Sequence, residues 1–213
     1  MAAANDPLLQ AYLKGELPVL EWTPQGQLRP LAQPPKAVLP GSFNPLHAGH
    51  LRLAQAAESL LGWAVWFGMS AVNAEKPRQS PEELWRRLQQ FRGIGSVLLT
   101  GADTFARQAQ LVPGVVFVVG IDTAARVGQL RFYQNDPALR EQALAQLRAC
   151  GCRFLVGGRV NAEGRFLSLG DIELPAGYED LFQAIPESLF RADVSSTQLR
   201  QAGWHTGPVG LDA

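Results

Sequence analysis

The sequence predicts an α/β fold in which a doubly wound sheet of parallel strands carries helices on both faces. Short apolar runs with little alternation recur along the chain, as expected for parallel strands covered on both sides. These runs are residues 37–39, 64–69, 97–99, 115–119 and 154–156. Segments with helical periodicity lie between them, which favours right-handed strand–helix–strand crossovers. Ligands of such sheets bind beyond the carboxyl ends of the strands, so candidate site residues are sought there.

Residues 1–35 differ in pattern from the rest of the chain. Asp6 and Pro7 predict the start of a short helix that reaches Lys14. Two short runs on either side of a Thr-Pro-Gln-Gly turn then predict a hairpin over residues 19–29. A Pro-Pro pair closes the segment. We expect residues 1–35 to be an extension packed on one domain that spans residues 36–213.

Two later helices have clear start signals. Ser-Pro-Glu-Glu at residues 80–83 is a capping box with proline in the first turn, and Leu84, Leu88 and Phe91 then recur on one face. Asp-Pro at residues 136–137 predicts the start of another helix. The inward side of that helix is expected to hold Leu139, Ala143, Leu144 and Leu147.

Composition limits the classes of function. The 213 residues are 46% hydrophobic and 18% charged, as in an ordinary globular protein, and 19 basic residues balance 19 acidic ones. A broad nucleic-acid-binding surface is therefore not expected, although a local phosphate pocket is compatible with this balance. No apolar run approaches the ~20 residues that span a bilayer, and no secretory signal is recognisable, so a cytoplasmic protein without a membrane partner is expected. No feature specifies an oligomeric state.

Residues 41–50 carry the most informative pattern. They follow the first apolar run and read Gly-Ser-Phe-Asn-Pro-Leu-His-Ala-Gly-His. His47 and His50 thus stand three residues apart at a helix start, on the same side of the helix. Backbone N–H groups in a first turn have no partner within the helix, and two imidazoles beside them suit a polyphosphate. A metal site is disfavoured, since no third ligand stands nearby in sequence.

Residues 194–200 form a second candidate segment. They read Val-Ser-Ser-Thr-Gln-Leu-Arg, and Ser195 with a glutamine three residues later predicts a capped helix start. The N–H groups of such a start favour phosphate. The hydroxyls of Ser196 and Thr197 can add donors, and Arg200 can bind phosphate oxygens through two parallel hydrogen bonds. Taken alone, the segment is equally compatible with an ordinary surface helix.

Together the two segments resemble the signature of the nucleotidyltransferases that share an H-x-G-H motif, a superfamily with cytidylyltransferase-like members. The first is most similar to that of the nicotinamide or nicotinate mononucleotide adenylyltransferases. The second resembles their I-S-S-T-x-x-R motif, with valine in place of isoleucine. The resemblance covers about residues 36–203 and implies a Rossmann-like sheet of the nucleotidyltransferase type. It implies adenylyl transfer from ATP to nicotinamide mononucleotide, giving NAD and pyrophosphate, with Mg²⁺ held through phosphates.

The resemblance also implies residue roles. It assigns His47, His50 and Arg200 to catalysis, as groups that bind the triphosphate and stabilise charge in the transition state. Further ATP-binding residues that it implies are Gly41, Ser42, Phe43, Gly49, Gly120, Asp122, Ser195, Ser196 and Thr197. The implied mononucleotide-binding residues are Ser42, Phe43, Asn73 and Lys76, the last two in an Asn-x-x-Lys-Pro element. Glycines 157 and 158 are expected to let an adenine lie against the backbone.

Several alternatives remain open at this point. Asp122 alone can be read as the cap of the next helix, and residues 70–78 as an ordinary polar loop. Within the same chemistry, the acceptor can be nicotinate mononucleotide, phosphopantetheine or, in cytidylyl transfer, an alcohol phosphate. Asn44 and the Asn73–Lys76 element favour a pyridine nucleotide. A non-catalytic nucleotide-binding regulator is the competing class, and the intact histidine pair argues against it.

Overall fold

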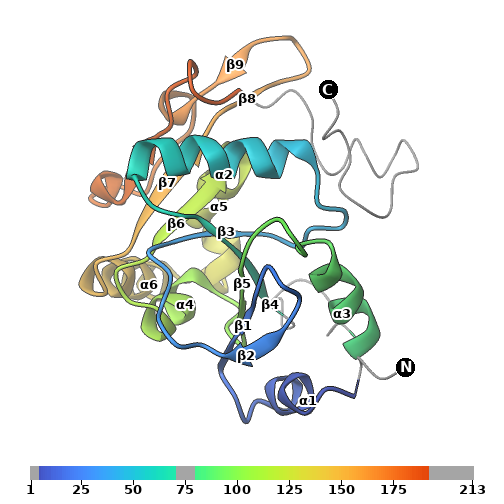
Figure 1. The fold of residues 1–213 in the computed structure, drawn as a ribbon. Coiled ribbons are helices and arrows are strands. Elements are labelled where there is room, and N and C mark those ends of the chain that lie inside the picture. Colours follow the sequence, from blue (N-terminus) through green and yellow to red (C-terminus); the bar gives the residue numbers. More distant parts are fainter. Residues whose placement is uncertain (1–4, 71–79, 192–213) are drawn as a thin grey trace.

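The computed structural model describes residues 5–70 and 80–191 (Figure 1). Along the chain its helices and strands are α1 (Pro7–Lys14), β1 (Val19–Trp22), β2 (Leu28–Pro30), β3 (Ala37–Pro40), α2 (Ala48–Leu61), β4 (Trp66–Ser70), α3 (Pro81–Gln89), β5 (Val97–Thr100), α4 (Phe105–Leu111), β6 (Val116–Gly120), α5 (Ile121–Val127), α6 (Pro137–Ala149), β7 (Arg153–Gly157), β8 (Arg159–Val160), β9 (Phe166–Leu167) and β10 (Phe182–Ala184). Short 3-10 turns lie at Leu130–Tyr133, Leu169–Asp171 and Glu179–Leu181.

The described residues form an eight-stranded sheet in the order β10-β7-β6-β3-β4-β5-β1-β2. The six strands from β10 to β5 are parallel, while β1 pairs antiparallel with both β5 and β2. β8 and β9 form a separate small hairpin, which lies above α2 at the top of Figure 1. The five predicted strands are thus confirmed, and the sheet is Rossmann-like as expected. The short edge strand β10 was not predicted, because Phe-Gln-Ala carries no strand pattern.

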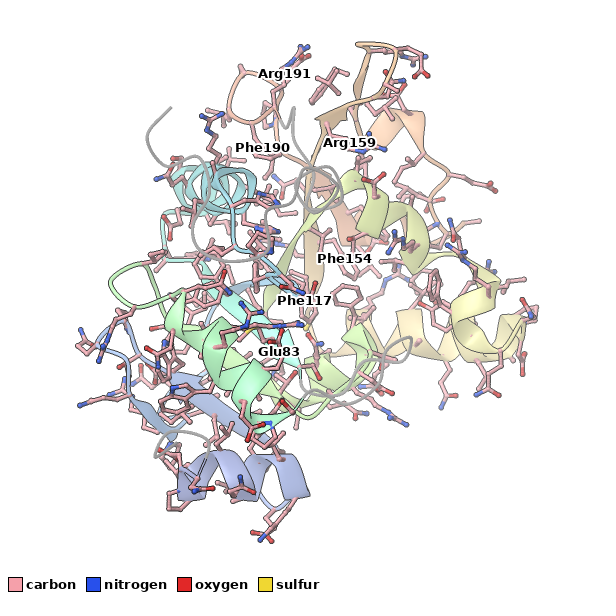
Figure 2. All side chains as sticks on the ribbon, turned by 90° about the vertical axis from the view of Figure 1, so that its right-hand side faces the viewer. Glu83, Phe117, Phe154, Arg159, Phe190 and Arg191 are labelled. Carbon is pink, nitrogen blue, oxygen red and sulfur yellow. The ribbon has the colours of Figure 1, made fainter. Side chains whose placement is uncertain are left out.

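The strands separate two apolar cores. In β5, for example, Val97 and Leu99 belong to one core and Leu98 to the other. Helices α1, α2 and α3 contribute to the first core, and α4, α5 and α6 to the second. In the second core the ring centroids of Phe117 and Phe154 lie 5.7 Å apart. Both residues are labelled in Figure 2. Both faces of the parallel sheet are therefore covered, which explains the continuous apolar runs.

The start of α3 is capped as predicted, but only in part. The Ser80 hydroxyl accepts a hydrogen bond from the backbone N–H of Glu83 at 3.2 Å. The Glu83 carboxylate does not complete the capping box. It accepts from the guanidinium groups of Arg86 and Arg87 at 2.7–2.8 Å instead. Charge-assisted hydrogen bonds to arginine are stronger than one to a backbone N–H, so the arginines hold this carboxylate.

The inward face of α6 differs from the prediction at one residue. Leu144 and Leu147 are buried, whereas Leu139 is 37% exposed. Leu139 precedes Leu144 by five residues, which places it about 140° away around the helix. The prediction that Leu139 faces inward is therefore wrong.

The segment before residue 36 is joined to the β5 side of the sheet. β1 pairs with β5 from Val19 opposite Thr100 to Trp22 opposite Val97. The Tyr12 hydroxyl in α1 donates a hydrogen bond to the backbone oxygen of Thr100 at 2.6 Å. Among the helices of the described ranges, none has the length and apolarity needed to cross a membrane.

Candidate functional site

The candidate site lies where the strand order of the sheet reverses. β3 stands between β4, which it reaches through α2, and β6, which lies on its other side. The helices that follow β3 and β6, α2 and α5, therefore lie on opposite faces of the sheet. Open α/β sheets bind their ligands at such a switch point. The loop after β3 is the one that carries both predicted histidines.

The two histidines lie together at the start of α2. His47 is the N-cap residue, with an extended backbone, and His50 lies in the first turn. Their imidazole rings are stacked, with centroids 3.7 Å apart and planes inclined by 25°. His47 is 5% exposed and therefore buried. The prediction that both rings stand on one side of a helix start agrees with this geometry.

The protonation state of His50 follows from its contacts. The backbone N–H of His47 donates a hydrogen bond to Nδ1 of His50 at 3.3 Å. Nδ1 is then the unprotonated nitrogen, and a neutral ring carries its hydrogen on Nε2. Burial, together with the charge of His47, lowers the pKa of His50 to about 3. At neutral pH this ring therefore acts as an N–H donor without a net charge.

The loop before the histidines is built around Phe43. Its φ of 42° lies in the left-handed region, which costs a non-glycine residue about 1–3 kcal/mol. The ring is 1% exposed and packs edge-on against Phe67, Phe91 and His50. A Cβ atom at Gly41 would lie 2.8 Å from this ring, so only glycine fits there. Because the Phe43 ring is buried, its predicted ligand contact is left to the backbone.

Side chains of α3 hold this loop from the other side, and the sequence analysis missed them. Oε1 of Gln90 accepts from the N–H of Leu46 at 2.9 Å, and Nε2 of Gln90 donates to the backbone oxygen of Phe43 at 3.0 Å. Nη1 of Arg87 donates to the backbone oxygen of Ser42 at 3.1 Å. Nothing in the local sequence distinguishes these polar residues from the other polar residues of α3.

Glu83, which Figure 2 shows on α3, holds the side chains of Arg86 and Arg87 in place. Its carboxylate accepts hydrogen bonds from Arg86 and from Arg87. The hydrogen bond from Arg86 first, and then that from Arg87 and the two positive charges, lower the pKa of Glu83 to about 2. Nη2 of Arg86 also donates to Oδ1 of Asn44 at 3.3 Å. An ionised carboxylate thus keeps both guanidinium groups directed at the loop.

The carboxyl end of β6 supplies the other predicted residues. Gly120 is the N-cap of α5, and a Cβ atom there would meet nothing within 4 Å, so the space beside it is open. Asp122 lies in the first turn of α5 and is not the cap, so the capping alternative is wrong. Its carboxylate pairs with Arg159, which is labelled in Figure 2, through contacts of 2.7 and 3.0 Å. Both side chains are partly exposed, 56% for Asp122 and 37% for Arg159.

The two glycines after β7 allow close packing within the protein. A Cβ atom at Gly157 would lie 2.5 Å from Leu53 of α2 and 2.8 Å from Phe190. A Cβ atom at Gly158 would lie 2.3 Å from Phe166. Protein side chains therefore lie against both glycines, and an adenine contact at these residues stays a prediction. The same contacts place Phe190, near the end of the described chain, beside the first turns of α2.

Several predicted residues lie outside the described part of the chain. They are Asn73, Lys76, Ser195, Ser196, Thr197 and Arg200. The described members of the predicted ATP site fall into two groups, one in the loop and first turn after β3 and one at the end of β6. Gly41, Ser42, Phe43, His47, Gly49 and His50 belong to the first group, and Gly120 and Asp122 to the second.

The described residues do not gather the side chains that a metal ion requires. Across residues 5–70 and 80–191, no cluster of three or more histidine, cysteine, aspartate or glutamate side chains could hold a metal ion. Asp122, the acidic residue that the resemblance places near the phosphates, is engaged with Arg159. The histidines and the backbone N–H groups at the start of α2 are hydrogen-bond donors that suit an anionic ligand.

The comparisons with known proteins agree with this geometry at the level of a family. A family model described as cytidylyltransferase-like matches residues 38–202. The match runs from β3 through the histidine loop and includes the Ser-Ser-Thr segment. No curated protein matches the chain.

Proposed function

Because this chain belongs to the cytidylyltransferase-like family, and so to the nucleotidyltransferases, we propose that it transfers an adenylyl group from ATP to nicotinamide mononucleotide. The products are NAD and pyrophosphate. The observation that carries the proposal is the stacked pair of His47 and His50 at the start of α2, next to the switch point of the sheet. The pair presents imidazole donors beside the N–H groups of a helix start, an arrangement that suits a triphosphate.

The proposed step needs no covalent intermediate with the protein. An oxygen of the mononucleotide 5′-phosphate attacks the α-phosphorus of ATP and forms the new P–O bond. The bond from the α-phosphorus to the oxygen that bridges to the β-phosphate breaks, and its electron pair leaves with pyrophosphate. A phosphate is already a competent nucleophile. Rate enhancement then comes from aligning two anions and from stabilising charge on the departing pyrophosphate.

His50 has a defined part in this step. Its Nδ1 is occupied by the N–H of His47, so its Nε2–H is the group available to a phosphate oxygen. A neutral donor can strengthen its hydrogen bond as charge builds on the leaving group, without first attracting a proton from solvent. His47 is its stacked partner, and the N–H groups of the first turn of α2 are the remaining described donors.

The end of the described chain supports a contribution from the second segment. Phe190 lies beside Gly157 at the carboxyl end of β7, and Leu53 of α2, one turn beyond His50, lies beside the same glycine. Residues 194–200 follow a few positions later. We propose that Ser195, Ser196, Thr197 and Arg200 meet the same triphosphate. The proximity of Phe190 to α2 makes this reachable within a short length of chain.

Magnesium enters the proposal as part of the Mg·ATP substrate. The described residues do not form a metal-binding cluster, and Mg²⁺ characteristically keeps several waters and binds substrate phosphates. The residues of this chain are therefore assigned to the phosphates and not to the ion.

Asn44 supports a pyridine mononucleotide as the acceptor. Several relatives that act on other acceptors carry aspartate at this place, and here Oδ1 of Asn44 accepts from Arg86. The Asn73–Lys76 element adds to the same proposal through its resemblance to the pyridine-nucleotide enzymes.

One assay distinguishes the candidate reactions. Pyrophosphate release is measured with ATP and, in turn, nicotinamide mononucleotide, nicotinate mononucleotide and phosphopantetheine, and with CTP and an alcohol phosphate. We expect the highest kcat/KM with ATP and nicotinamide mononucleotide. A higher value with another pair would replace the acceptor while keeping the chemistry. Binding of ATP without turnover on any acceptor would contradict the proposal and favour a regulator.

A further inference from the structure

We propose that Gln90, at the C-terminal end of α3, is a positioning residue that sets the geometry of the histidine pair through its side-chain amide. The inference rests on the proposed function only in treating His47 and His50 as the reactive site. It does not depend on which acceptor is used. None of the sequence motifs described above includes Gln90.

The amide of Gln90 uses both of its ends on the histidine loop. Its oxygen accepts from the N–H of Leu46 at 2.9 Å, and its nitrogen donates to the backbone oxygen of Phe43 at 3.0 Å. The same nitrogen donates to the backbone oxygen of Arg87 at 3.2 Å. Leu46 is 0% and Phe43 1% exposed. Buried backbone groups of this kind need a partner, and Gln90 supplies it from another element of the fold.

The two loop contacts span the turn that leads into the site. Phe43 has the left-handed φ of 42°, a conformation that persists only when its surroundings hold it. Leu46 immediately precedes His47, so a bond to its N–H restrains the backbone from which that imidazole projects. The ring of Phe43 also lies edge-on to that of His50, with centroids 4.9 Å apart. A shift at either end of the turn would therefore move one of the two imidazoles.

A second anchor on α3 supports the same loop. Arg87 donates to the backbone oxygen of Ser42 and is held by Glu83. The histidine loop thus depends on α3, a helix that follows β4 in the chain. In Figure 1 the segment between β3 and α2 passes close to α3, in agreement with these hydrogen bonds. Reacting groups displaced by about 1 Å can lose about 100-fold in rate, so this support bears on turnover.

The test replaces Gln90 by glutamate. The Gln90→Glu side chain keeps its length and the acceptor for Leu46, but it sets a carboxylate oxygen against the carbonyls of Phe43 and Arg87. Gln89→Glu is the matched control, since it makes the same change one residue earlier and the side chain of Gln89 makes no hydrogen bond within the described ranges. We expect kcat of Gln90→Glu to fall at least ~10-fold, with the KM of each substrate within ~3-fold of wild type. Gln89→Glu should stay within ~2-fold.

A readout independent of turnover accompanies the kinetics. The chain has three histidines, so ¹⁵N–¹H correlation spectra of the imidazoles can be assigned by substitution. The signals of His47 and His50 should shift in Gln90→Glu and stay in place in Gln89→Glu. Gln90→Met removes the same hydrogen bonds without introducing a charge, and the same shifts are expected in this variant if Gln90→Glu does not fold.

The outcomes separate this inference from the proposed function. Unmoved imidazole signals, or a kcat equal to that of Gln89→Glu, would overturn the positioning role even if the wild type makes NAD. Shifted signals in a protein that turns over no acceptor would leave the positioning role standing and contradict the proposed reaction.

Discussion

The backbone N–H of His47 donates to Nδ1 of His50 at 3.3 Å, and this contact determines which nitrogen of His50 is free for a ligand. A neutral ring with an occupied Nδ1 has its hydrogen on Nε2. The stacked neighbour and the buried setting both disfavour a positive charge on this ring. His50 is thus arranged as a directed hydrogen-bond donor, and long-range attraction of the anionic substrates falls to other groups.

The lowered pKa of His50 predicts a pH dependence of stability. Its pKa is about 3 in the folded protein against an ordinary value of 6.5. Between these values the unfolded chain binds a proton that the folded chain does not, so stability falls as pH decreases from about 6.5 towards 3. The free energy of unfolding falls by at most about 1.4 kcal/mol for each pH unit.

Urea unfolding of wild type and His50→Gln at pH 7, 6 and 5 measures this effect. Glutamine keeps an acceptor for the N–H of His47 but does not titrate. The free energy of unfolding of the wild type should fall more steeply on acidification than that of His50→Gln. Parallel curves would show that His50 is not held neutral by the fold.

Asp122 offers a test of the second group of site residues. Its ion pair with Arg159 is partly exposed, so Asp122→Ala should change the free energy of unfolding by less than about 1 kcal/mol. Loss of a carboxylate that accepts from ATP should raise the KM for ATP about 10-fold or more. Kinetics with varied ATP and chemical denaturation of the same sample measure both quantities.

Asp180→Ala is the control for this variant. Asp180 pairs with Arg148 at similar exposure, but it precedes β10 and so lies at the amino edge of the sheet, away from the strand ends that carry the site. An ATP KM that changes equally in both variants would remove Asp122 from the nucleotide site.

The sequence predicted best those elements whose local residue pattern matches their surroundings in the folded protein. The strands β3 to β7 are buried on both faces and therefore appear as apolar runs, and the starts of α1, α3 and α6 carry a side-chain cap followed by proline. The motif at residues 41–50 combined a turn and a helix start, so the adjacency of His47 and His50 was predictable. Their stacking and the tautomer of His50 were not, because both depend on how the loop is held.

What the sequence could not predict consists of contacts between distant elements. Gln90 bonds the histidine loop across 44 positions from Leu46 and 47 from Phe43, and no local periodicity marks such a partner. Glycine 157 was associated with a ligand because glycine permits close approach. In the fold, the approaching groups are Leu53 and Phe190. A residue type that allows contact does not specify what makes it.

Arg200 carries the prediction for the second segment. If its guanidinium binds phosphate oxygens of ATP, Arg200→Ala should raise the KM for ATP and the inhibition constant of pyrophosphate by about 10- to 100-fold, since a hydrogen bond to a charged group is worth about 1.5–3 kcal/mol. The KM for the mononucleotide should change much less. Arg107→Ala, which removes an exposed arginine of α4, provides the control. Unchanged constants in Arg200→Ala would exclude the second segment from the triphosphate site.

The most direct test is the effect of His50→Ala on adenylyl transfer, with ³¹P NMR used to follow ATP, NAD and pyrophosphate in one sample. Wild type with ATP and nicotinamide mononucleotide should form NAD and pyrophosphate in equal amounts. His50→Ala should remain folded and turn over at least ~100-fold more slowly, the loss expected for a transition-state donor. The third histidine of the chain, His205, lies outside both motifs, and His205→Ala should match wild type. An equally active His50→Ala protein, or a wild type that leaves the ATP signals unchanged, would contradict the proposed reaction at the histidine pair.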